Sequence, residues 1–380
     1  MGMNRARKQA SRYSREKKFN FAQSVIGRSF TRAVRLNSPL ITHNQRTMKI
    51  ITERAYARAA LAGNPSDGYG GKTISLTMAN YCAKVVVYQW PELEIIPSAS
   101  EGVQFRSLAD LSVDVGRNGY YGALRLVKAS IKRFHDYCVE HNVSLLDENF
   151  SIRYETDVPR GVGMAGSSAI IVATFRALMR FYNVEIPQPI LPDWILSVEK
   201  AELGIEGGLQ DRVAQVYGGL TYMNFDAELT ARQGHGDYQS LDASKLPPLY
   251  LAFQTDLAEP SDIVHNDLRA RYDAGDKAVH AAMDELAGIT DAARAAIEGG
   301  DAAELARQID ANFDVRDRIM KVVAGHKAMI LAARSVGASA NFAGSGGAIL
   351  GTYSGERADF EKLKQTLGAL GCKVIVPRVA

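Results

Sequence analysis

A glycine-rich segment that leads directly into an apolar helix constrains the fold of this 380-residue chain more than any other feature. Residues 159–169 read Pro-Arg-Gly-Val-Gly-Met-Ala-Gly-Ser-Ser-Ala, and the apolar run 170–173 follows at once. Glycines let the backbone take positive φ values and approach a ligand closely, while the N-terminus of the following helix attracts an anion. Small residues also cap helices without binding a ligand. The segment therefore predicts a phosphate-binding loop, with simple capping as the alternative.

Composition is typical of a globular protein. The hydrophobic content of 46% is enough for a substantial core, and the length suggests two domains with one short extra segment. The three cysteines stand far apart without metal-ligand or redox spacing, which predicts no structural zinc and a cytoplasmic, reducing location. No apolar stretch approaches the roughly 18 residues that span a bilayer, so we expect no membrane association.

Charge is distributed unevenly along the chain. Residues 1–47 carry 11 Lys or Arg against the single acid Glu16, an excess of 10 positive charges. Since the whole chain has a net charge of +3, residues 48–380 carry −7. This acidic body argues against a protein that binds nucleic acid. We expect residues 1–47 to be a disordered basic tail or sequence upstream of a true start at Met48, with a transit peptide as the alternative.

Apolar periodicity predicts an α+β fold. A core-facing helical stripe is formed by Leu124, Val127, Ile131, Phe134 and Cys138. Helices are expected at 121–137, 167–181, 193–203 and within 264–336. Strands are expected at 49–51, on both sides of a turn at 64–68, and at 84–88, 151–156, 217–223, 249–253, 348–350 and 373–376. A polar, proline-flanked stretch at 227–248 predicts a domain boundary, which divides the chain into domains at 48–246 and 247–380.

Residues suited to phosphoryl transfer occur in a fixed order. Three glycine-rich elements lie at 63–71, 161–166 and 344–347. Glu199 and Asp211 stand between the second and the third. Phosphoryl transfer needs a backbone cradle for the triphosphate, a magnesium ion held by a hydroxyl and a carboxylate, and a carboxylate beside the attacking hydroxyl. Ser167 or Ser168 with Glu199 supplies the metal ligands in this interpretation, and Asp211 orients or deprotonates the acceptor. Taken singly, each has an ordinary structural alternative, such as a helix cap or a solvated face.

From about Met48 to its end, the chain resembles the GHMP kinase superfamily. The superfamily's second motif, Pro-x-x-x-Gly-Leu-Gly-Ser-Ser-Ala, corresponds to residues 159–169 with one extra small residue. Its magnesium-binding acid corresponds to Glu199, its catalytic aspartate to Asp211, and its third motif to residues 344–347. The resemblance implies a ribosomal-protein-like N-terminal α/β domain and a ferredoxin-like C-terminal domain, with ATP and Mg²⁺ as cofactors.

The first motif narrows the resemblance. Residues 58–67 read Arg-Ala-Ala-Leu-Ala-Gly-Asn-Pro-Ser-Asp and follow the sugar kinases' Gly-Arg-Val-Asn-Leu-Ile-Gly-Glu-His-Thr-Asp, with Arg58 and Asp67 in place. Asn64 and Pro65 replace Glu-His, which departs from galactokinase and resembles the glucuronokinase family. Further matching blocks lie at 90–94, 208–219 and 312–316. The resemblance implies ATP-dependent phosphorylation of the anomeric hydroxyl of a sugar acid, D-glucuronate above all, to give glucuronate 1-phosphate; another sugar is the alternative.

The resemblance also implies roles for individual residues. Asp211 and Arg58 are the expected catalytic pair, because a fixed positive charge stabilises the transferring phosphoryl group. Ser168 and Glu199 are the expected magnesium ligands. The residues expected to bind the phosphates of ATP are Pro159, Gly161, Val162, Gly163, Met164, Ala165, Gly166, Ser167, Ser168 and Ala169. The residues expected to bind the sugar are Asn64, Asp67, Gly346 and Gly347.

A sugar acid requires one more group, a cation for its carboxylate, and a bidentate arginine suits it best. Arg316, Arg271 and Arg212 are candidates, and the sequence does not choose among them. The expected partners are the sugar acid and ATP, with no nucleic acid and no membrane; the oligomeric state stays open.

Two look-alike motifs lead to a competing hypothesis. Residues 161–166 read Gly-x-Gly-x-x-Gly with Glu185 about 20 residues beyond, as in a dinucleotide-binding fold. That fold needs a buried strand directly before the first glycine, whereas residues 155–160 are polar and contain a proline. Residues 70–73 imitate the end of a P-loop, but its first glycine falls at Ser66. A nicotinamide-dependent oxidoreductase is therefore the less favoured hypothesis, together with a catalytically inactive sugar-binding relative.

Overall fold

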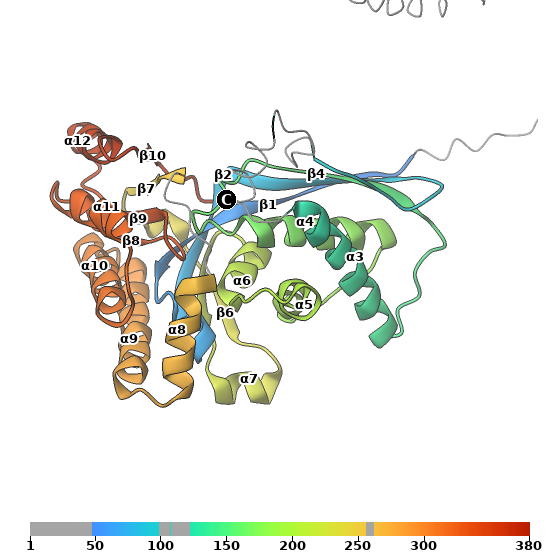
Figure 1. Ribbon diagram of the computed structural model, residues 1–380, viewed down its shortest axis with the longest axis horizontal. Helices are drawn as coiled ribbons and strands as arrows, with labels where there is room; N and C mark the ends of the chain where they lie inside the picture. Colours follow the sequence, from blue (N-terminus) through green and yellow to red (C-terminus); the bar gives the residue numbers. More distant parts are fainter. Residues whose placement is uncertain (1–47, 99–106, 108–121, 256–261) are drawn as a thin grey trace, which may run out of the picture. The chain divides into compact units, whose positions relative to one another are not determined.

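Two antiparallel strands form the centre of the first sheet in the computed structural model, which describes residues 48–98, 107, 122–255 and 262–380 (Figure 1). Strand β1 (Ile50–Ala62) pairs with β2 (Lys72–Gln89). In β2, the buried Val85 and Val87 alternate with more exposed neighbours, which is the period of two that a half-buried strand requires. The strand predicted at 84–88 is therefore confirmed as part of a longer one.

The first sheet contains four further strands. They are β3 (Glu94–Ile96), β4 (Phe150–Thr156), β5 (Leu220–Asn224) and β6 (Asp237–Leu241). The order is β3-β4-β2-β5-β6, with β1 paired to β2, and every pairing except β3–β4 is antiparallel. Strand β6 lies in the polar stretch for which the sequence predicted no element, and so does helix α7 (Ala227–Gln233). The sequence did not indicate this strand, because most of its residues are polar and none is fully buried.

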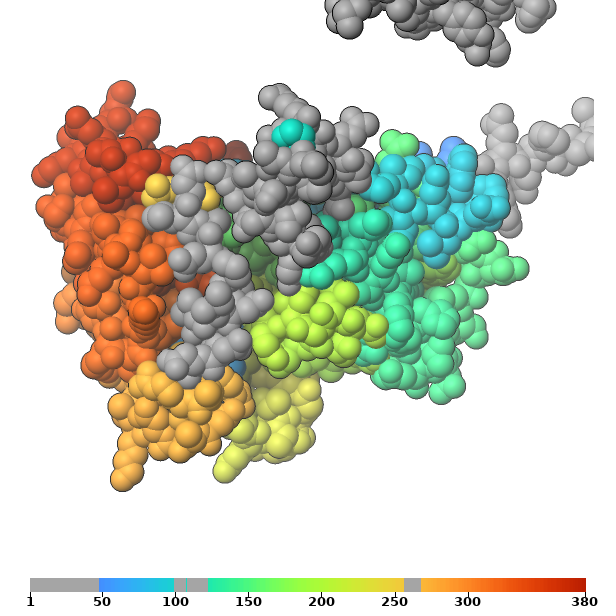
Figure 2. Space-filling view, viewed as in Figure 1, coloured from blue at the N-terminus to red at the C-terminus, as the bar shows by residue number. Residues whose placement is uncertain are grey.

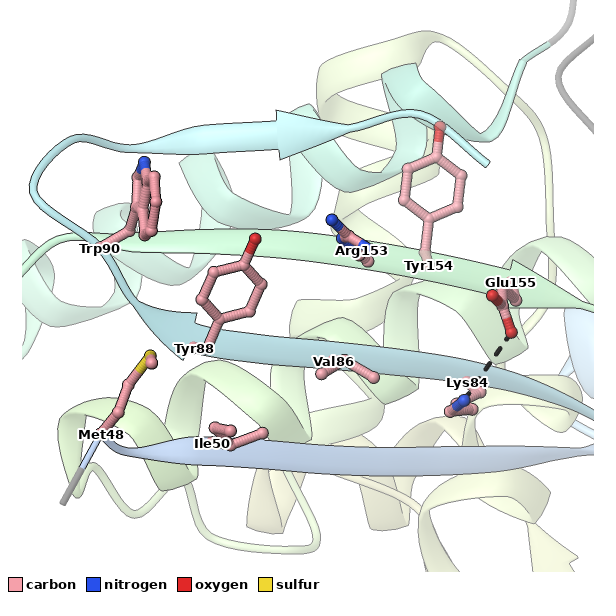
Figure 3. Close-up of a pocket in the computed structure, with 9 residues that line it drawn as sticks. All are labelled: Met48, Ile50, Lys84, Val86, Tyr88, Trp90, Arg153, Tyr154 and Glu155. Atoms are coloured by element: carbon pink, nitrogen blue, oxygen red, sulfur yellow. Dashed lines mark ion pairs between the residues drawn. The ribbon is translucent and has the colours of Figure 1, made fainter. Parts of the chain in front are cut away.

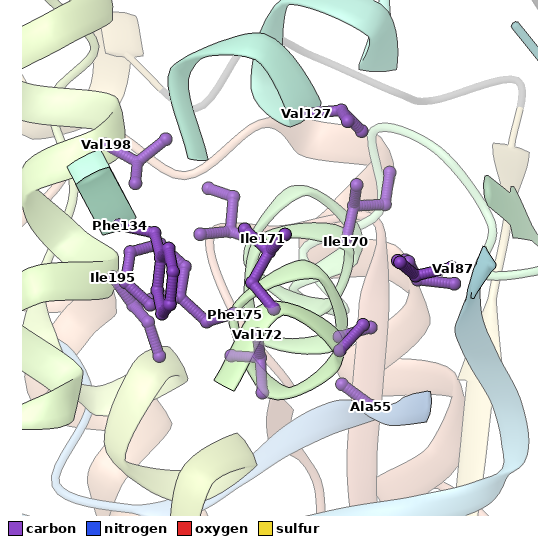
Figure 4. Packing of buried hydrophobic residues seen from close by; sticks show 14 of the residues in the cluster. Ala55, Val87, Val127, Phe134, Ile170, Ile171, Val172, Phe175, Ile195 and Val198 are labelled. Atoms are coloured by element: carbon purple, nitrogen blue, oxygen red, sulfur yellow. The ribbon is translucent and has the colours of Figure 1, made fainter. Parts of the chain in front are cut away.

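Helices cover one side of the first sheet (Figure 1). They are α3 (Ala123–Glu140), α4 (Gly166–Tyr182), α5 (Leu191–Ser197) and α6 (Leu209–Tyr217), with a π-helical turn at Val198–Glu202 after α5. The predicted stripe of α3 packs inward: Val127, Phe134 and Cys138 are buried, and Phe134 meets Phe175 of α4 edge to face at 6.2 Å (Figure 4). Helix α4 is buried over most of its length, because it lies between the sheet and the other helices.

The opposite side of the sheet has a shallow pocket over β1, β2 and β4 (Figure 3). Its lining includes Ile50, Val86, Tyr88 and Trp90, and Lys84 pairs with Glu155 across it at 3.8 Å. None of the candidate site residues lines this pocket. The surface is therefore separate from the site described below.

The second sheet is formed by strands after residue 248. They are β7 (Leu249–Phe253), β8 (Asn341–Phe342), β9 (Ala348–Thr352) and β10 (Lys373–Ile375), all antiparallel in the order β10-β7-β9-β8. The helices are α8 (Asp262–Asp273), α9 (Lys277–Gly299), α10 (Ala302–Ile319), α11 (Ala324–Arg334) and α12 (Arg357–Gly368). In space-filling form, the C-terminal residues shown in orange and red form a continuous surface (Figure 2).

The two sheets share buried contacts. Leu76 of β2, Leu251 of β7 and Ile309 of α10 belong to one hydrophobic cluster. The backbone N–H of Ala60 donates to the carbonyl of Ala343 at 2.8 Å, which joins β1 to the loop after β8. The predicted α+β class is therefore confirmed, while the domain boundary near residue 247 stays a prediction. In the described part of the chain, no helix has the length and apolarity of a membrane span.

Candidate active site

The glycine loop between β4 and α4 has a backbone that leaves the helix N-terminus open. Gly161 and Gly163 each have a φ of 69°, and Ala165, the N-cap of α4, has a φ of 60°. A left-handed conformation costs a non-glycine residue on the order of 1 kcal/mol or more, so the surrounding structure holds Ala165 there. No side chain caps α4. No side chain therefore competes with an anion for the first-turn N–H groups, and the phosphate-binding role of the loop stays a prediction.

The second and third glycine loops are in direct backbone contact. A Cβ atom at Gly344 would lie 2.1 Å from the carbonyl oxygen of Gly163, and one at Gly163 would lie 2.8 Å from the backbone nitrogen of Ser345. Neither position has room for a side chain. The structure therefore brings together two segments about 180 positions apart that the sequence could only place in order.

Arg58 joins these loops to Asp211. Its guanidinium forms an ion pair with Asp211 Oδ1 in the first turn of α6, and its Nη1 donates to the carbonyl of Ala343. The same Nη1 lies 3.5 Å from the carbonyl of Gly163. The Arg58 side chain is 5% exposed and that of Asp211 is 23% exposed, so the carboxylate faces outward from a buried arginine. The expected catalytic pair thus lies at the junction of the two loops.

Glu199, the expected metal ligand, is paired with an arginine. It lies in the π-helical turn, is 3% exposed, and accepts a hydrogen bond from Arg212 Nη2. Arg212 Nη1 donates to the carbonyl of Gly208 at 2.9 Å and lies 3.5 Å from Asp211 Oδ2. Burial by itself would lower the pKa of Arg212, but Glu199 and Asp211 raise it above its ordinary value. Arg212 therefore bridges two expected functional carboxylates, a role that the sequence did not predict.

The expected metal ligands, Ser168 and Glu199, offer few oxygen atoms to a metal ion. Ser168 is fully buried, and its Oγ donates to the carbonyl of Ala165 at 3.2 Å. Glu199 uses Oε2 for Arg212, and its Oε1 has no partner among the residues that the structure describes. Within the same residues there is no cluster of three or more His, Cys, Asp or Glu side chains suited to a metal. Such a site fits an ion held mostly by phosphate oxygens, since Mg²⁺ takes few protein ligands.

Asn64 and Asp67 both contact Gln210, which the sequence analysis did not single out. Asn64 Nδ2 donates to Gln210 Oε1 at 2.8 Å, and the Gln210 backbone N–H donates to Asp67 Oδ2 at 3.3 Å. Gln210 Nε2 is held by Ser75 Oγ at 2.8 Å. Gln210 precedes Asp211 within the matching block 208–219, which was the available signal. This glutamine fixes the expected sugar-binding residues relative to the expected catalytic aspartate.

Asp67 has a strongly perturbed carboxyl group. Burial, together with the nearby Asp211, raises its pKa to about 6 against the lowering effects of the Gln210 N–H, Arg58 and Arg212. Gly208 comes close to the same carboxylate, because a Cβ there would lie 2.1 Å from Asp67 Oδ2. Perturbed carboxyl groups of this kind gather at functional sites.

Helix α10 supplies two more residues. Asn312 accepts from the N–H of Gly63 at 2.5 Å and donates to the carbonyl of Asn64 at 3.1 Å. Arg316, one turn later on the same face, donates from Nη1 to Asn64 Oδ1 at 2.6 Å and to the carbonyl of Gly344 at 3.0 Å. The sequence analysis quoted block 312–316 but gave Asn312 no role; its spacing of four from Arg316 was the missed signal.

The remaining expected residues differ in how deeply they are buried. Val162, Met164 and Ala169 are buried in the core and anchor the glycine loop, whereas Pro159, Gly166 and Ser167 are half-buried. The expected sugar-binding residues of the third loop are Gly346 and Gly347, with φ values of 148° and 75°. A Cβ at Gly346 would lie 2.8 Å from Nδ1 of the buried His326, which the sequence did not identify.

Arg271 does not join these groups. It bonds to Asp276 at 3.0 Å and to the carbonyl of Ile319 at 2.7 Å.

The structure does not favour the dinucleotide-binding hypothesis. Strand β4 ends at Thr156, five residues before Gly161, and it runs antiparallel to its neighbour β2. A dinucleotide-binding unit requires parallel strands joined through the glycine loop and its helix.

Comparison with known proteins identifies the family. The chain matches the family described as the GHMP kinases N terminal domain over residues 125–219. It is 42% identical over 308 residues to glucuronokinase 1 of Arabidopsis thaliana and 40% identical over 310 residues to probable glucuronokinase 2 of the same plant; each alignment covers 79% of this chain and 84% of the relative. The fold is similar to that of Lactococcus lactis galactokinase complexed with galactose, with a TM-score of 0.69, 14% identity, and coverage of 87% of this chain and 94% of that structure.

The predicted two-domain α+β architecture of this superfamily is thereby confirmed, since the structural neighbours share it. The oxidoreductase hypothesis receives no support from these relatives. The chain belongs to the glucuronokinases, a family of sugar kinases within the GHMP kinases.

Proposed function

We propose that the protein transfers the γ-phosphoryl group of ATP to the anomeric hydroxyl of D-glucuronate, which yields D-glucuronate 1-phosphate and ADP. One observation carries the proposal: the Arg58–Asp211 ion pair lies where two glycine loops meet, in a chain about 40% identical to two glucuronokinases. ATP is the phosphoryl donor of the GHMP kinase family.

The phosphates of ATP are proposed to bind in the loop at 161–166 and at the first turn of α4. The fit rests on three features: positive φ at Gly161 and Gly163, the uncapped N-terminus of the helix, and the absence of room for a Cβ at Gly163. The N–H groups of this turn would bind phosphate oxygens, and the helix dipole would add a favourable partial charge.

Ser168 and Glu199 are proposed to hold Mg²⁺. Glu199 Oε1 is available for this role while Oε2 stays with Arg212. When bound, the ion would neutralise charge on the β- and γ-phosphates.

The catalytic step is assigned to Asp211 and Arg58. Asp211 accepts the proton of the anomeric hydroxyl as the bond from that oxygen to the γ-phosphorus forms. The bond between the γ-phosphorus and its bridging oxygen breaks, and the electron pair leaves with ADP. Arg58 holds the Asp211 carboxylate in position and places a fixed positive charge next to the transferring group.

The sugar is proposed to contact Asn64, Asp67, Gly346 and Gly347. The carboxylate of Asp67 accepts hydrogen bonds from sugar hydroxyls, and the glycine backbone lets the ring approach the third loop. Gln210 supports both Asn64 and Asp67 from the interior.

A substrate panel tests the proposal. The full chain is assayed for ADP release with D-glucuronate, D-galacturonate, D-glucose and D-galactose, and the product is identified by ³¹P NMR. We expect the highest kcat/KM with D-glucuronate and a phosphate ester at C1. Turnover of a neutral hexose but of no uronate would contradict the substrate assignment. Fluorescence titration with ATP–Mg²⁺ and with NADH provides a second check, and NADH binding in preference to ATP would contradict the kinase mechanism.

A further inference from the structure

Arg316 is a buried arginine without an acidic partner. It is 1% exposed and lies on α10. Its Nη1 donates to two neutral acceptors, Asn64 Oδ1 at 2.6 Å and the carbonyl of Gly344 at 3.0 Å. Its Nε is buried without an acceptor, and Arg316 forms no ion pair within the described residues. Buried charges in proteins are normally paired, so this guanidinium is an exception that calls for an anion.

The electrostatic surroundings of Arg316 strengthen this conclusion. Burial, together with the nearby Arg58, lowers its pKa to about 9, while Asp67 acts in the opposite direction. The side chain is therefore still charged at neutral pH. Arg58 has Asp211 as its counter-ion and Arg212 has Glu199, whereas Arg316 has none of its own.

Arg316 lies next to the proposed reaction centre. Arg58 bonds to the carbonyl of Ala343 and Arg316 to the carbonyl of Gly344, so the two guanidiniums hold consecutive peptide groups. Arg316 also bonds to Asn64, which belongs to the proposed sugar site. An anion bound by Arg316 would thus lie beside the proposed sugar site.

The other candidate arginines are already occupied. Arg212 pairs with Glu199 and with the carbonyl of Gly208. Arg271 pairs with Asp276 and with the carbonyl of Ile319. Neither has the unmatched charge that Arg316 has.

The free edge of Arg316 suits a carboxylate. Both of its protein hydrogen bonds leave from Nη1, so Nε and Nη2 remain without acceptors among the described residues. These two groups form a fork that binds a carboxylate through two parallel hydrogen bonds. The ring of Phe342 lies 5.0 Å from the guanidinium carbon and helps to fix its orientation.

We propose that Arg316 binds the carboxylate of the sugar acid side-on through Nε and Nη2 and thereby selects uronates over neutral sugars. The inference rests on the proposed function, because it assigns one contact within that substrate site. Asn64 Oδ1 accepts one of the two Nη1 hydrogens, and this bond helps to orient the guanidinium.

The first test compares two substrates that differ at the carboxyl group. D-Glucuronamide carries a neutral amide in place of the carboxylate of D-glucuronate. For Arg316→Gln, we expect kcat/KM for D-glucuronate to fall about 10- to 100-fold, while kcat/KM for D-glucuronamide changes about threefold or less. Arg316→Lys keeps the charge but loses the fork, so it should restore part of the loss. Arg318→Gln, on the same helix in an exposed pair with Glu285, is the matched control and should leave the substrate ratio unchanged.

The second test does not remove the arginine. Asn64→Asp places a carboxylate on Arg316 Nη1, where the wild type has an amide oxygen. This internal partner should compete with the substrate carboxylate, so KM should rise more for D-glucuronate than for D-glucuronamide. Because the change also removes the hydrogen bond from Asn64 Nδ2 to Gln210 Oε1, ATP binding is measured to show that the fold is kept. Should Arg316→Gln fail to fold, as shown by lost ATP binding and a collapsed thermal midpoint, Arg316→Lys and Asn64→Asp decide the question.

The outcomes separate this inference from the proposed function. If the wild type phosphorylates no sugar acid, both are wrong. If it phosphorylates D-glucuronate and the Arg316 variants lower kcat/KM equally for the acid and its amide, the carboxylate assignment alone is overturned. A KM for D-glucuronate that is unchanged in Asn64→Asp would also overturn it.

Discussion

Arg58 and Asp211, 153 positions apart in the sequence, form an ion pair in which the arginine is buried and the carboxylate is partly exposed. The arginine lies on β1 and the aspartate at the start of α6, so the pair joins the sheet to the helix layer. The same guanidinium bonds to the carbonyl of Ala343 beside the third glycine loop. This geometry lets one buried cation contact both the proposed catalytic base and the backbone beside the third glycine loop.

Asp211→Asn should reduce turnover by orders of magnitude and leave ATP affinity nearly unchanged. The amide keeps an oxygen acceptor for Arg58 but cannot take the proton of the sugar hydroxyl. ADP release measures turnover, and isothermal titration measures ATP binding. Asp291→Asn, an exposed carboxylate paired with Lys72, is the control and should behave as wild type. Unchanged turnover in Asp211→Asn would remove this residue from the mechanism.

Arg58→Met should lower both stability and activity. It removes a buried cation, its bond to Ala343 and the partner of Asp211, which we expect to cost about 1–3 kcal/mol in the free energy of unfolding. Urea denaturation measures this cost. Arg180→Met is the control, because its pair with Glu53 is exposed and should contribute roughly 0–1 kcal/mol. Equal losses in the two variants would show that Arg58 is an ordinary surface ion pair.

Gly163→Ala should weaken ATP binding and destabilise the fold by about 2 kcal/mol or more. Its φ is 69°, and the added Cβ would lie 2.8 Å from the Ser345 nitrogen, so the two loops must separate. Thermal unfolding and ATP titration measure the two effects. Gly288→Ala in the exposed interior of α9 is the matched control: its Cβ meets no atom within 4 Å, and alanine should stabilise the helix by roughly 0.5–1 kcal/mol. A Gly163→Ala protein with wild-type ATP affinity would contradict the proposed role of this loop.

Activity should decline on the acid side with a midpoint near pH 6. The pKa of Asp67 is raised from 3.8 to about 6, chiefly by burial, so the carboxylate that would accept sugar hydroxyls becomes protonated below that pH. The measurement is kcat/KM for D-glucuronate from pH 4.5 to 8. Asp67→Asn should lower kcat/KM and remove this midpoint. An acid limb that is identical in Asp67→Asn would assign it to another group.

The same carboxyl group should affect stability in the opposite direction. Because its pKa is higher in the folded state than in the unfolded state, ionisation of Asp67 favours unfolding. This unfavourable contribution is absent below about pH 4 and fully present above about pH 6, with an upper limit of about 3 kcal/mol. The stability of the wild type relative to Asp67→Asn should therefore fall as the pH rises from 4 to 7. Urea denaturation across this range measures the difference, and a difference that does not change with pH would contradict it.

Local patterns predicted much of the secondary structure. The stripe from Leu124 to Cys138 became the buried face of α3, and the valine run at 84–88 became part of β2. The spacing of apolar residues along the chain is a local property, so a single sequence is enough to predict these elements. Strand β6 was missed because most of its residues are polar and none is fully buried, and the pairing with β5 that stabilises it is not a local property.

The sequence by itself determined the parts of the site that depend on backbone freedom and on a motif in fixed order: the glycine loop at 161–166, the register of Arg58 and Asp67, and the position of Asp211. The tertiary structure alone decided which charges meet. It paired Glu199 with Arg212, placed Gln210 between Asn64 and Asp67, and left Arg316 without a counter-ion although it bonds to Asn64, 252 positions away. The physical reason is that the chain must close long loops and exclude water before two charges interact strongly, and no local pattern records which charges will then share the same low-dielectric space.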